Sequence, residues 1–599
     1  MSLRDVPTIV SARPASPEWG SDVAAEMLRR LRVPYIALMP GASFRGLHDS
    51  IVNYLSNDGP SLVLCNHEEV AVAVAHGYAK LTGRAMAAAV HSTVGLMHAT
   101  MTIFCAWCDR VPVLVLGGTG PMDATARRPW IDWIHTAHAQ GELVRDFTKW
   151  EDQPASVAAM PGSLLRAWQL AHLEPRGPVY VCLDQGLQEE RLAAPIAMPD
   201  LTNVVPPTAP APDPDAVDRA ARLLVEAERP LLLLGRTSAS DAAWADTVAL
   251  AELLGAAVTT DRSGPTSFPT DHPLHQGMWR SQSHDAAVAE IGDADVILAV
   301  DRLDVAGALR SRAGRPVHLV NVSLESYATR SWSADYQEVV LAEIAITASA
   351  DPTIAALRSA VERLLADAPN ARRRAEDRAK VVGRRSRERR AAWTAENDAR
   401  RDSSPVHLAR ALGELRAALG RRADDAIVAQ APLGPWPTTA WEFTRPHAHL
   451  GHDGGAGVGS GPGIAVGAAL AARGSGRTVV AVIGDGELLA APTALWTAAH
   501  HAIPILFVIA NNQSYFNDEE HQERVARARL RPVENRWVGQ RMDTPAVDFA
   551  RLARDLGVTG IGPVSEPSAL AGAMRQAVAA IDEGGPALVD VRIVPRVAP

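Results

Sequence analysis

Cysteine is scarce in this sequence, which also has no long apolar run and no excess of positive charge. The four cysteines are Cys65, Cys105, Cys108 and Cys182, and they show no pairing framework. Cys105-Ala-Trp-Cys108 lacks the second Cys pair that a zinc site needs. It is either a redox pair or, as we favour, a pair of packing thiols in an apolar segment. A formal net charge of −9 argues against nucleic-acid binding.

The start of the chain shows no basic stretch followed by an apolar one, and no run reaches transmembrane length. We therefore expect a soluble, cytoplasmic protein without a membrane partner. Hydrophobic residues make up 47% of the chain and charged residues 21%, which is typical of globular proteins. A length of 599 residues leaves room for about three or four domains.

Helix and strand patterns alternate in three successive stretches. Short Val-, Ile- and Leu-rich strands such as SLVLCN and VPVLVLGG alternate with helical patterns such as EEVAVAVAHGYAKLTG. This alternation predicts an α/β fold of three doubly wound parallel-sheet domains. The predicted parts are an N-terminal arm at 1–20, a first domain at 21–193, a Pro-rich linker at 194–214, a middle domain at 215–366, a charged connecting helix at 367–404 and a third domain at 405–599.

Two features of this organisation have competing explanations. The segment 370–401 is dense in Arg and Glu, and we favour a solvated helix face of mixed charge over a nucleic-acid patch. The segments 77–84 and 467–477 both lead into a strand and then into a Val-Pro or Ile-Pro strand start at similar spacing. This echo predicts one shared topology for the first and third domains, although unrelated α/β units also use similar residues.

The stretch 478–515 gives the strongest chemical signal. Its runs 478–483 and 505–509 predict buried strands, and 494–501 predicts a helix between them. The carboxyl ends of two parallel strands meet at one sheet edge, where open α/β sheets bind ligands. Asp485 and the Asn511-Asn512 pair would lie there, and carboxylate and amide oxygens are the hard ligands that Mg²⁺ prefers.

This stretch resembles the cofactor motif of thiamine-diphosphate enzymes, which begins Gly-Asp-Gly and ends in Asn or Asn-Asn. The resemblance implies pyrimidine-binding, middle and diphosphate-binding domains for the three predicted parts. It also implies that thiamine diphosphate and Mg²⁺ bind here. The motif residues carried over are Gly484, Asp485, Gly486, Glu487, Asn512 and Ser514, with Asp485, Asn512 and the Ser514 carbonyl as the metal ligands.

Glu68 is the predicted catalytic acid. It follows the strand SLVLC and opens a helix, nine residues before Gly77-Tyr-Ala, which is the family's spacing. In this family such a carboxyl group hydrogen-bonds the aminopyrimidine ring and favours its imino form. Glu69 is the rival, but the His-Glu register of acetolactate synthases favours Glu68; simple helix-start electrostatics is the structural alternative.

Histidines supply the second set of candidates. His91 ends a predicted strand 23 residues after Glu68, and the His91-Ser92 pair resembles one in benzoylformate decarboxylase, where the His relays protons. The alternative is an ordinary hydrogen-bonded strand-end histidine. His135 and His138 lie where pyruvate decarboxylases carry a His pair, but the match is loose. Weak substrate candidates are therefore Ala42, Ser92, His135 and His138.

The remaining motif is the glycine-rich turn 454–460. By position it resembles the segment that props thiamine in a bent shape, with Val458 as the apolar wedge and Ala456 offering its carbonyl. Two departures stand out. Ala42 replaces a serine that contacts the carboxylate in benzoylformate decarboxylase, and Glu487 replaces a small hydroxyl residue beside the diphosphate. A carboxylate would repel a diphosphate, so we expect Glu487 to turn aside or to bind another group.

The resemblance implies a decarboxylase or carboligase that acts on a 2-oxo acid or diketone. Two alternatives stay open: an acetolactate-synthase-like carboligase, and a non-catalytic thiamine-diphosphate-binding protein. FAD is carried only as an unsupported possibility, because the middle domain shows no recognisable flavin contacts. The family's sites lie between subunits, so the resemblance also implies a homodimer or homotetramer.

Overall fold

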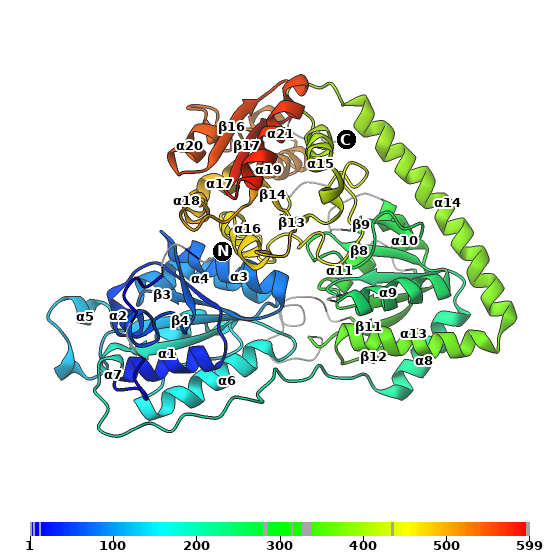
Figure 1. The fold of residues 1–599 in the computed structure, drawn as a ribbon. Helices are drawn as coiled ribbons and strands as arrows, with labels where there is room; N and C mark the ends of the chain where they lie inside the picture. Colours follow the sequence, from blue (N-terminus) through cyan, green and yellow to red (C-terminus); the bar gives the residue numbers. More distant parts are fainter. Residues whose placement is uncertain are drawn as a thin grey trace. The chain divides into compact units, whose positions relative to one another are not determined.

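The computed structural model describes residues 3, 6–10, 13–238, 240–279, 286–310, 312, 315–325, 338, 340–432 and 436–594. It contains three sheets, of six, six and five strands, each flanked by helices (Figure 1). The predicted fold class, three parallel-sheet α/β domains, is confirmed. The chain divides into two compact units, one formed by 1–207, 429–434 and 453–599 and the other by 208–428 and 435–452.

The first unit contains the N-terminal six-stranded sheet, whose strand order is β2-β1-β3-β4-β6-β5. Its strands pair in parallel and their inner residues are buried, because crossover helices cover the sheet. The strands are β1 Tyr35–Leu38, β2 Ser61–Leu64, β3 Met86–Val90, β4 Val113–Thr119, β5 Glu151–Asp152 and β6 Val179–Asp184. The helices are α1 Gly20–Arg30, α2 Arg45–Asp49, α3 Glu68–Thr82, α4 Val94–Asp109, α5 Ile131–Ile134, α6 Met160–His172 and α7 Gln185–Gln188.

The C-terminal sheet has five strands in the order β13-β14-β15-β17-β16. Its strands are β13 Ile427–Gln430, β14 Val479–Gly484, β15 Leu506–Asn511, β16 Thr559–Val564 and β17 Ala587–Arg592. Its helices in the first unit are α16 Ser460–Ala471, α17 Asp485–Ala490, α18 Thr493–His500, α19 Phe516–Ala528, α20 Phe549–Asp555 and α21 Pro567–Asp582. Without the edge strand β2, the N-terminal sheet has the same order, so the two domains share the topology that the sequence echo predicted.

The two glycines that open the echoed segments lie where helices α3 and α16 pack together. A Cβ atom on Gly77 would stand 1.8 Å from the carbonyl oxygen of Ile464, and one on Gly467 would stand 1.9 Å from that of Val74. Each glycine therefore lets the backbone of the other helix approach it directly, since any side chain would fill that space. The helix that begins with Glu68 is thus packed backbone to backbone against the helix that follows the glycine-rich turn.

The second unit holds the middle sheet, ordered β12-β11-β10-β7-β8-β9. Its strands are β7 Pro230–Leu234, β8 Ala257–Asp261, β9 His275–Trp279, β10 Val296–Val300, β11 His318–Val322 and β12 Ile344–Ile346. Its helices are α8 Pro214–Glu226, α9 Asp241–Leu254, α10 Ala286–Asp293, α11 Val305–Arg310, α13 Ala350–Ala366, α14 Pro369–Ala399 and α15 Leu408–Leu419. A continuous apolar core lines this sheet.

Helix α14 corresponds to the charged segment of the sequence. Few of its residues are buried, and its arginines pair with acids of its own unit: Arg385 and Arg389 with Glu290, and Arg390 with Glu442. This arrangement fits the solvated connecting face rather than a nucleic-acid patch.

The four cysteines are buried and form no disulfide bonds, and burial raises the pKa of the Cys105 thiol. The Cys105 thiol donates to the Asp453 carboxylate at 3.4 Å, just before the glycine-rich turn. A buried thiol with a raised pKa is a poor nucleophile, which fits a packing role for Cys105. In the part of the chain that the structure describes, no helix combines the length and the apolar character needed to cross a membrane.

Candidate functional site

The Gly-Asp-Gly motif begins where strand β14 ends. β14 and β15 are parallel neighbours, with Gly484 in register with Ala510, so Asp485 and the Asn pair share one sheet edge. After the strand, the chain passes straight into the six-residue helix α17, whose first residue is Asp485. Gly486 is needed here, because a Cβ atom on it would stand 2.5 Å from the ring of Tyr515.

Asp485 is a buried carboxylate, and one of its two oxygens accepts no hydrogen bond from the described residues. Only 3% of the residue is exposed, and its Oδ1 accepts a hydrogen bond from the Gly486 N–H at 3.0 Å. Among the described residues no group donates to Oδ2, which is also buried. Burial raises the pKa of Asp485 to about 6, although nearby backbone N–H groups, including those of Gln513 and Ser514, oppose the rise. An orphaned, desolvated carboxylate oxygen of this kind fits a cation site.

Asn511 and Asn512 have different hydrogen-bond partners. Asn511 is buried, donates through Nδ2 to Asp590 at 2.8 Å and accepts from Arg592, so its side chain is committed to the sheet. Asn512 is half-buried, and its Oδ1 accepts from the Ser514 N–H at 3.0 Å. The Ser514 hydroxyl donates to Glu519. The Ser514 carbonyl oxygen takes no part in that bond and can bind another group. Of the two amides, Asn512 is therefore the one with capacity to hold a ligand.

Glu487 has a partner of its own. Its Oε1 accepts a hydrogen bond from the Gly461 N–H at 2.8 Å, in the first turn of α16. A carboxylate at a helix N-terminus is stabilised by the free N–H groups there. The side chain is thus directed to the start of α16, just after the glycine-rich turn, where Ala456 adopts a positive φ of 50° and Val458 is 41% exposed.

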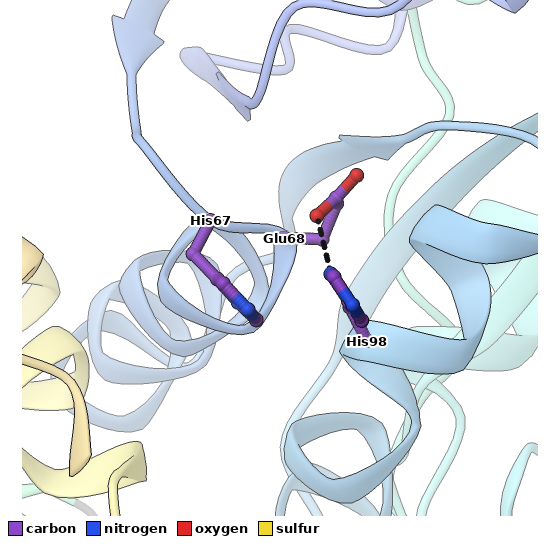
Figure 2. A group of neighbouring side chains, drawn as sticks. All are labelled: His67, Glu68 and His98. Atoms are coloured by element: carbon purple, nitrogen blue, oxygen red, sulfur yellow. Dashed lines mark hydrogen bonds and ion pairs between the residues drawn. The ribbon is translucent and has the colours of Figure 1, made fainter.

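Glu68 is the first residue of α3. His67 caps this helix, because its Nδ1 accepts from the Glu69 N–H at 3.1 Å. The strand β2 before it is tied down by a hydrogen bond from the Leu64 N–H to His501 Nε2 at 2.8 Å. The Glu68 side chain is only 5% exposed and lies 3.3 Å from His98 Nδ1, measured to Oε2 (Figure 2). Its other oxygen faces Gly95, where a Cβ atom would stand 2.6 Å away.

His91 lies directly beyond β3, on the other side of Gly95. Its Nδ1 is 2.8 Å from the Ser43 hydroxyl, which also accepts from the Ser92 N–H at 3.1 Å. The His91 ring meets the His135 ring edge-on, with centroids 4.7 Å apart. Burial, followed by the charge of His135, lowers the pKa of His91, while Glu68 acts in the opposite direction. The ring is therefore neutral near pH 7 and able to take or give a proton.

The turn that follows His91 has a strained backbone and is held by a side chain from another part of the chain. Thr93 has a φ of 37°, which is unusual for a β-branched residue. Its N–H and hydroxyl both donate to Gln140 Oε1, at 2.9 and 3.1 Å. Gln140 is in turn fixed by donating to the Tyr180 hydroxyl at 2.6 Å. Strain that is over-determined in this way is typical of functional turns.

The other sequence candidates lie as follows. Ala42 is exposed and opens the short turn that contains Ser43, whereas Ser92 is fully buried. His138 is exposed, three residues past His135. Sequence reasoning missed Ser43 and His98. Ser43 follows the noted Ala42 directly, and His98 lies in helix α4, which begins just after the noted His91-Ser92 pair, but no spacing rule singled out either residue.

Comparisons with known proteins identify the family of the chain. Models of thiamine pyrophosphate enzymes match the chain three times: the N-terminal TPP binding domain at 18–147, the central domain at 217–327 and the C-terminal TPP binding domain at 433–591. The acetolactate synthase large subunit of Parasynechococcus marenigrum is 25% identical over 99% of this chain and 91% of that protein. The benzoylformate decarboxylase of Pseudomonas aeruginosa is 25% identical over 88% and 91%.

Among solved structures, the benzoylformate decarboxylase from Polynucleobacter necessarius superposes with a TM-score of 0.77 at 20% identity, covering 97% of this chain and 100% of that one. The three parallel sheets define an α/β protein, with the buried carboxylate of Asp485 at a strand end of its C-terminal sheet. The chain belongs to the thiamine pyrophosphate enzyme family. Within it, the chain is a thiamine-diphosphate-dependent enzyme of the group that contains acetolactate synthases and benzoylformate decarboxylases.

Proposed function

We propose that this enzyme uses thiamine diphosphate and Mg²⁺ to break or form the carbon–carbon bond beside the carbonyl of a 2-oxo acid. The observation that carries the proposal is the pairing of two sites: a buried carboxyl, Glu68, beside the neutral His91, and the orphaned carboxylate oxygen of Asp485. The first supplies acid–base groups and the second a cation site, which are the two requirements of this chemistry. Decarboxylation is the favoured reaction, because the site offers a histidine proton donor.

The residues present fit the cofactor. Mg²⁺ would be held by the Asp485 carboxylate, the Asn512 amide oxygen and the Ser514 carbonyl, with Gly484 and Gly486 beside the diphosphate. Glu68 would bind the pyrimidine ring, Val458 would support the thiamine, and the Ala456 carbonyl would accept from its amino group. When bound, thiamine diphosphate supplies the nucleophilic carbon and the electron sink. The Glu487 carboxylate would hold the start of α16 next to the cofactor, through its hydrogen bond from the Gly461 N–H.

His91 would hold and move the proton at the substrate carbon. Because the Ser43 hydroxyl oxygen accepts from the Ser92 N–H, its own hydrogen is available for His91 Nδ1. That bond leaves the proton of the neutral ring on Nε2, so Nε2–H is the donor. His135 lies edge-on beside the ring and limits its rotation. Ser43 is thus a positioning residue for His91.

Asp485→Asn tests the cation site through stability as well as binding. Burial raises the folded-state pKa of Asp485 to about 6. The protonated carboxyl group therefore contributes fully to the stability of the fold below pH ~4, and this contribution is lost as the pH rises through ~6. At pH 7.5 the ionised carboxylate therefore costs up to roughly 3 kcal/mol when no cation is bound. We expect D485N to raise the free energy of unfolding of the cofactor-free protein at pH 7.5 by about 1–3 kcal/mol, measured by urea denaturation.

The same variant should lose the stabilisation that Mg²⁺ and thiamine diphosphate together give the wild type, about 2.7 kcal/mol at 100 times the dissociation constant. Asp518→Asn, at an exposed position of α19, is the matched control and should behave as wild type. A D485N protein whose thiamine-diphosphate binding still depends on Mg²⁺ as in the wild type would show that the metal site lies elsewhere.

The reaction itself is tested by incubating the loaded enzyme with a panel of 2-oxo acids and 1,2-diketones, with and without acceptor aldehydes. CO₂, free aldehyde and ligation products are measured together. We expect CO₂ from at least one 2-oxo acid, and we expect His91→Gln to lower free aldehyde by about 10²-fold or more. Ligation in H91Q should fall less, because a carbonyl acceptor replaces the proton. Equal loss of both products would remove His91 from the protonation step.

An acetolactate-synthase-like carboligase is the second candidate, favoured by the His67-Glu68 register and by the match to an acetolactate synthase over 99% of the chain. It predicts ligation products in preference to free aldehyde in the same screen. No product from any substrate would instead support a non-catalytic binding protein. We also propose a homodimer or homotetramer, because sites in this family are shared between subunits.

A further inference from the structure

One residue with an unusual backbone stands between the two proposed cation ligands Asn512 and Ser514. Gln513 has a φ of 58°, in the left-handed region that residues other than glycine rarely adopt. Beside it, the Ser514 N–H donates back to Asn512 Oδ1 at 3.0 Å. This Gln513 bend therefore decides how the Asn512 amide and the Ser514 carbonyl lie relative to each other. A bend of this kind persists only where the surrounding structure holds it.

The Asn511 side chain is the group that reaches the Gln513 bend. Its Oδ1 accepts the Gln513 N–H at 3.2 Å and a second hydrogen bond from Arg592 at 3.0 Å. Its Nδ2 donates to Asp590 Oδ1 at 2.8 Å. These partners fix which way the amide faces, because a carboxylate accepts whereas an N–H and a guanidinium donate. If the amide turned over, its NH₂ group would meet two donors and its oxygen would meet an acceptor.

Asp590 orients this amide from the neighbouring strand. It lies in β17, where it is fully buried, and β17 pairs in parallel with β15. Asp590 is in register with Ile509 and Arg592 with Asn511, so these side chains share one face of the sheet. Burial raises the pKa of Asp590, while the Asn511 amide and Arg592 oppose the rise. A carboxylate in a buried strand is costly without such partners, so its presence needs an explanation.

A purely structural explanation is that the polar pair joins β15 to β17. The main chain already does this, because the two strands pair in register from Leu506 to Asn511 and the Ile593 N–H donates to the Asn511 carbonyl at 3.0 Å. An apolar pair of similar volume would also fill the space between the strands. It could not accept the Gln513 N–H. The polar pair is therefore explained by the Gln513 bend and not by the sheet.

We propose that Asp590 and Asn511 are positioning residues for the cation site. Asp590 orients the Asn511 amide, and Asn511 holds Gln513 in its left-handed conformation. The bend in turn directs the Asn512 amide oxygen and the Ser514 carbonyl toward one ion. The first asparagine of the Asn-Asn pair thus positions the second, and neither Asp590 nor Asn511 contacts the cation. The inference rests on the proposed function, because it takes Asn512 and Ser514 as ligands of Mg²⁺.

Asp590→Leu and Asp590→Asn separate positioning from charge. Leucine has a similar size but accepts no hydrogen bond, so the Asn511 amide loses its orientation. Asparagine keeps an acceptor oxygen and loses the charge. The measurement is the Mg²⁺ concentration that half-saturates thiamine-diphosphate binding to the cofactor-free protein, by isothermal titration calorimetry. We expect D590L to raise this concentration about 10–100-fold and D590N to stay within about threefold of wild type.

Two results in this comparison would overturn the proposal. One is a D590L protein with the wild-type Mg²⁺ requirement, which would show that the Asn511 amide needs no orienting partner. The other is a loss in D590N as large as that in D590L. The charge of Asp590 would then act on the cation directly, and the hydrogen bond to Asn511 would be incidental.

Gln513→Gly tests the step through the backbone. Glycine adopts a positive φ without steric cost, so the bend then depends less on the hydrogen bonds that hold it. We expect Q513G alone to bind Mg²⁺ within about threefold of wild type. The double variant D590L/Q513G should recover about threefold or more of the loss in D590L. Equal Mg²⁺ requirements in D590L and the double variant would show that Asp590 does not act through Gln513, against the proposal.

Asp261→Leu is the matched control. Asp261 ends strand β8 of the second unit, where its side chain is 13% exposed and pairs with Arg302 at 2.8 Å. Like D590L, this variant removes a strand-end carboxylate from its partner, and thermal unfolding measures the destabilisation in both. D261L should leave the Mg²⁺ requirement unchanged. An increase equal to that in D590L would show that the measurement follows general destabilisation, which would also overturn the proposal.

The wild-type titration separates this inference from the proposed function. If thiamine-diphosphate binding by the wild type does not depend on Mg²⁺, the proposed cation site is wrong and the inference fails with it. If binding depends on Mg²⁺ equally in the wild type and in D590L, the cation site stands and only the positioning role fails.

Discussion

Replacing Glu68 by Gln is expected to lower turnover of any accepted 2-oxo acid by about 10²–10⁴-fold. Glutamine fills the same space and leaves the helix start intact, but it cannot give or take the proton that we propose Glu68 exchanges with the cofactor's pyrimidine ring. The buried position next to Gly95 excludes water from acting as a substitute. Single-turnover and steady-state kinetics with the loaded enzyme measure the loss.

Glu69→Gln is the informative comparison, because Glu69 is the adjacent rival on the same helix turn. The structure directs one of its oxygens at Gly459, and burial raises its pKa, with His98 opposing the rise. It makes none of the contacts that join Glu68 to His98 and Gly95. We expect E69Q to lose less than about tenfold in turnover. Equal activity in E68Q and wild type, with a large loss in E69Q, would exchange the two roles.

The second large effect is expected from Gly77→Ala. The added methyl group would stand 1.8 Å from the carbonyl oxygen of Ile464, where neither helix can yield without breaking its own hydrogen bonds. Overpacking of this kind costs about 3 kcal/mol or more, which lowers the midpoint of thermal unfolding by roughly 6–12 °C. Differential scanning calorimetry of the cofactor-free protein measures the shift. Gly467→Ala should have a similar effect, because its contact with Val74 is the mirror of the first.

Gly572→Ala controls for the backbone effect of the same substitution. Gly572 lies inside helix α21, and among the described atoms none is within 4 Å of a Cβ atom built on it. Alanine there should raise stability by about 0.5–1 kcal/mol through helix propensity alone. If G77A were as stable as G572A, the close approach of α3 and α16 would be wrong.

The fold could be predicted from the sequence because its signals are local. Runs such as 505–509 are short, apolar and β-branched, and the parallel sheet follows from their alternation with helices. The sequence similarity between the first and third domains corresponds to a shared strand order in the structure, for the same reason. The positions of the Asp485 carboxylate and Asn512 could also be predicted, since both lie at strand ends whose register the βαβ unit fixes.

The contacts between elements could not be predicted from the sequence in this way. His98 lies 30 residues after Glu68, and only the packing of α4 against α3 brings the two side chains together. Ser43 is one residue from the noted Ala42, yet its hydroxyl faces His91 because of the turn geometry. Glu487 was expected to turn aside, but its partner, the Gly461 N–H at the start of α16, depends on how two helices meet. Such pairings are set by tertiary packing, on which single-sequence periodicity carries no information.

The matching helices α3 and α16 begin in different ways, and this affects how the enzyme tolerates mutation. Strand β2 precedes α3, which opens with the side chain of Glu68, whereas a glycine-rich turn precedes α16 and presents main-chain groups. One point mutation can delete a carboxyl group, but no substitution removes a backbone carbonyl. Random mutagenesis should therefore inactivate the first domain's share of the site through single residues. The third domain's turn should fail only when its glycines are replaced and the chain can no longer follow the same path.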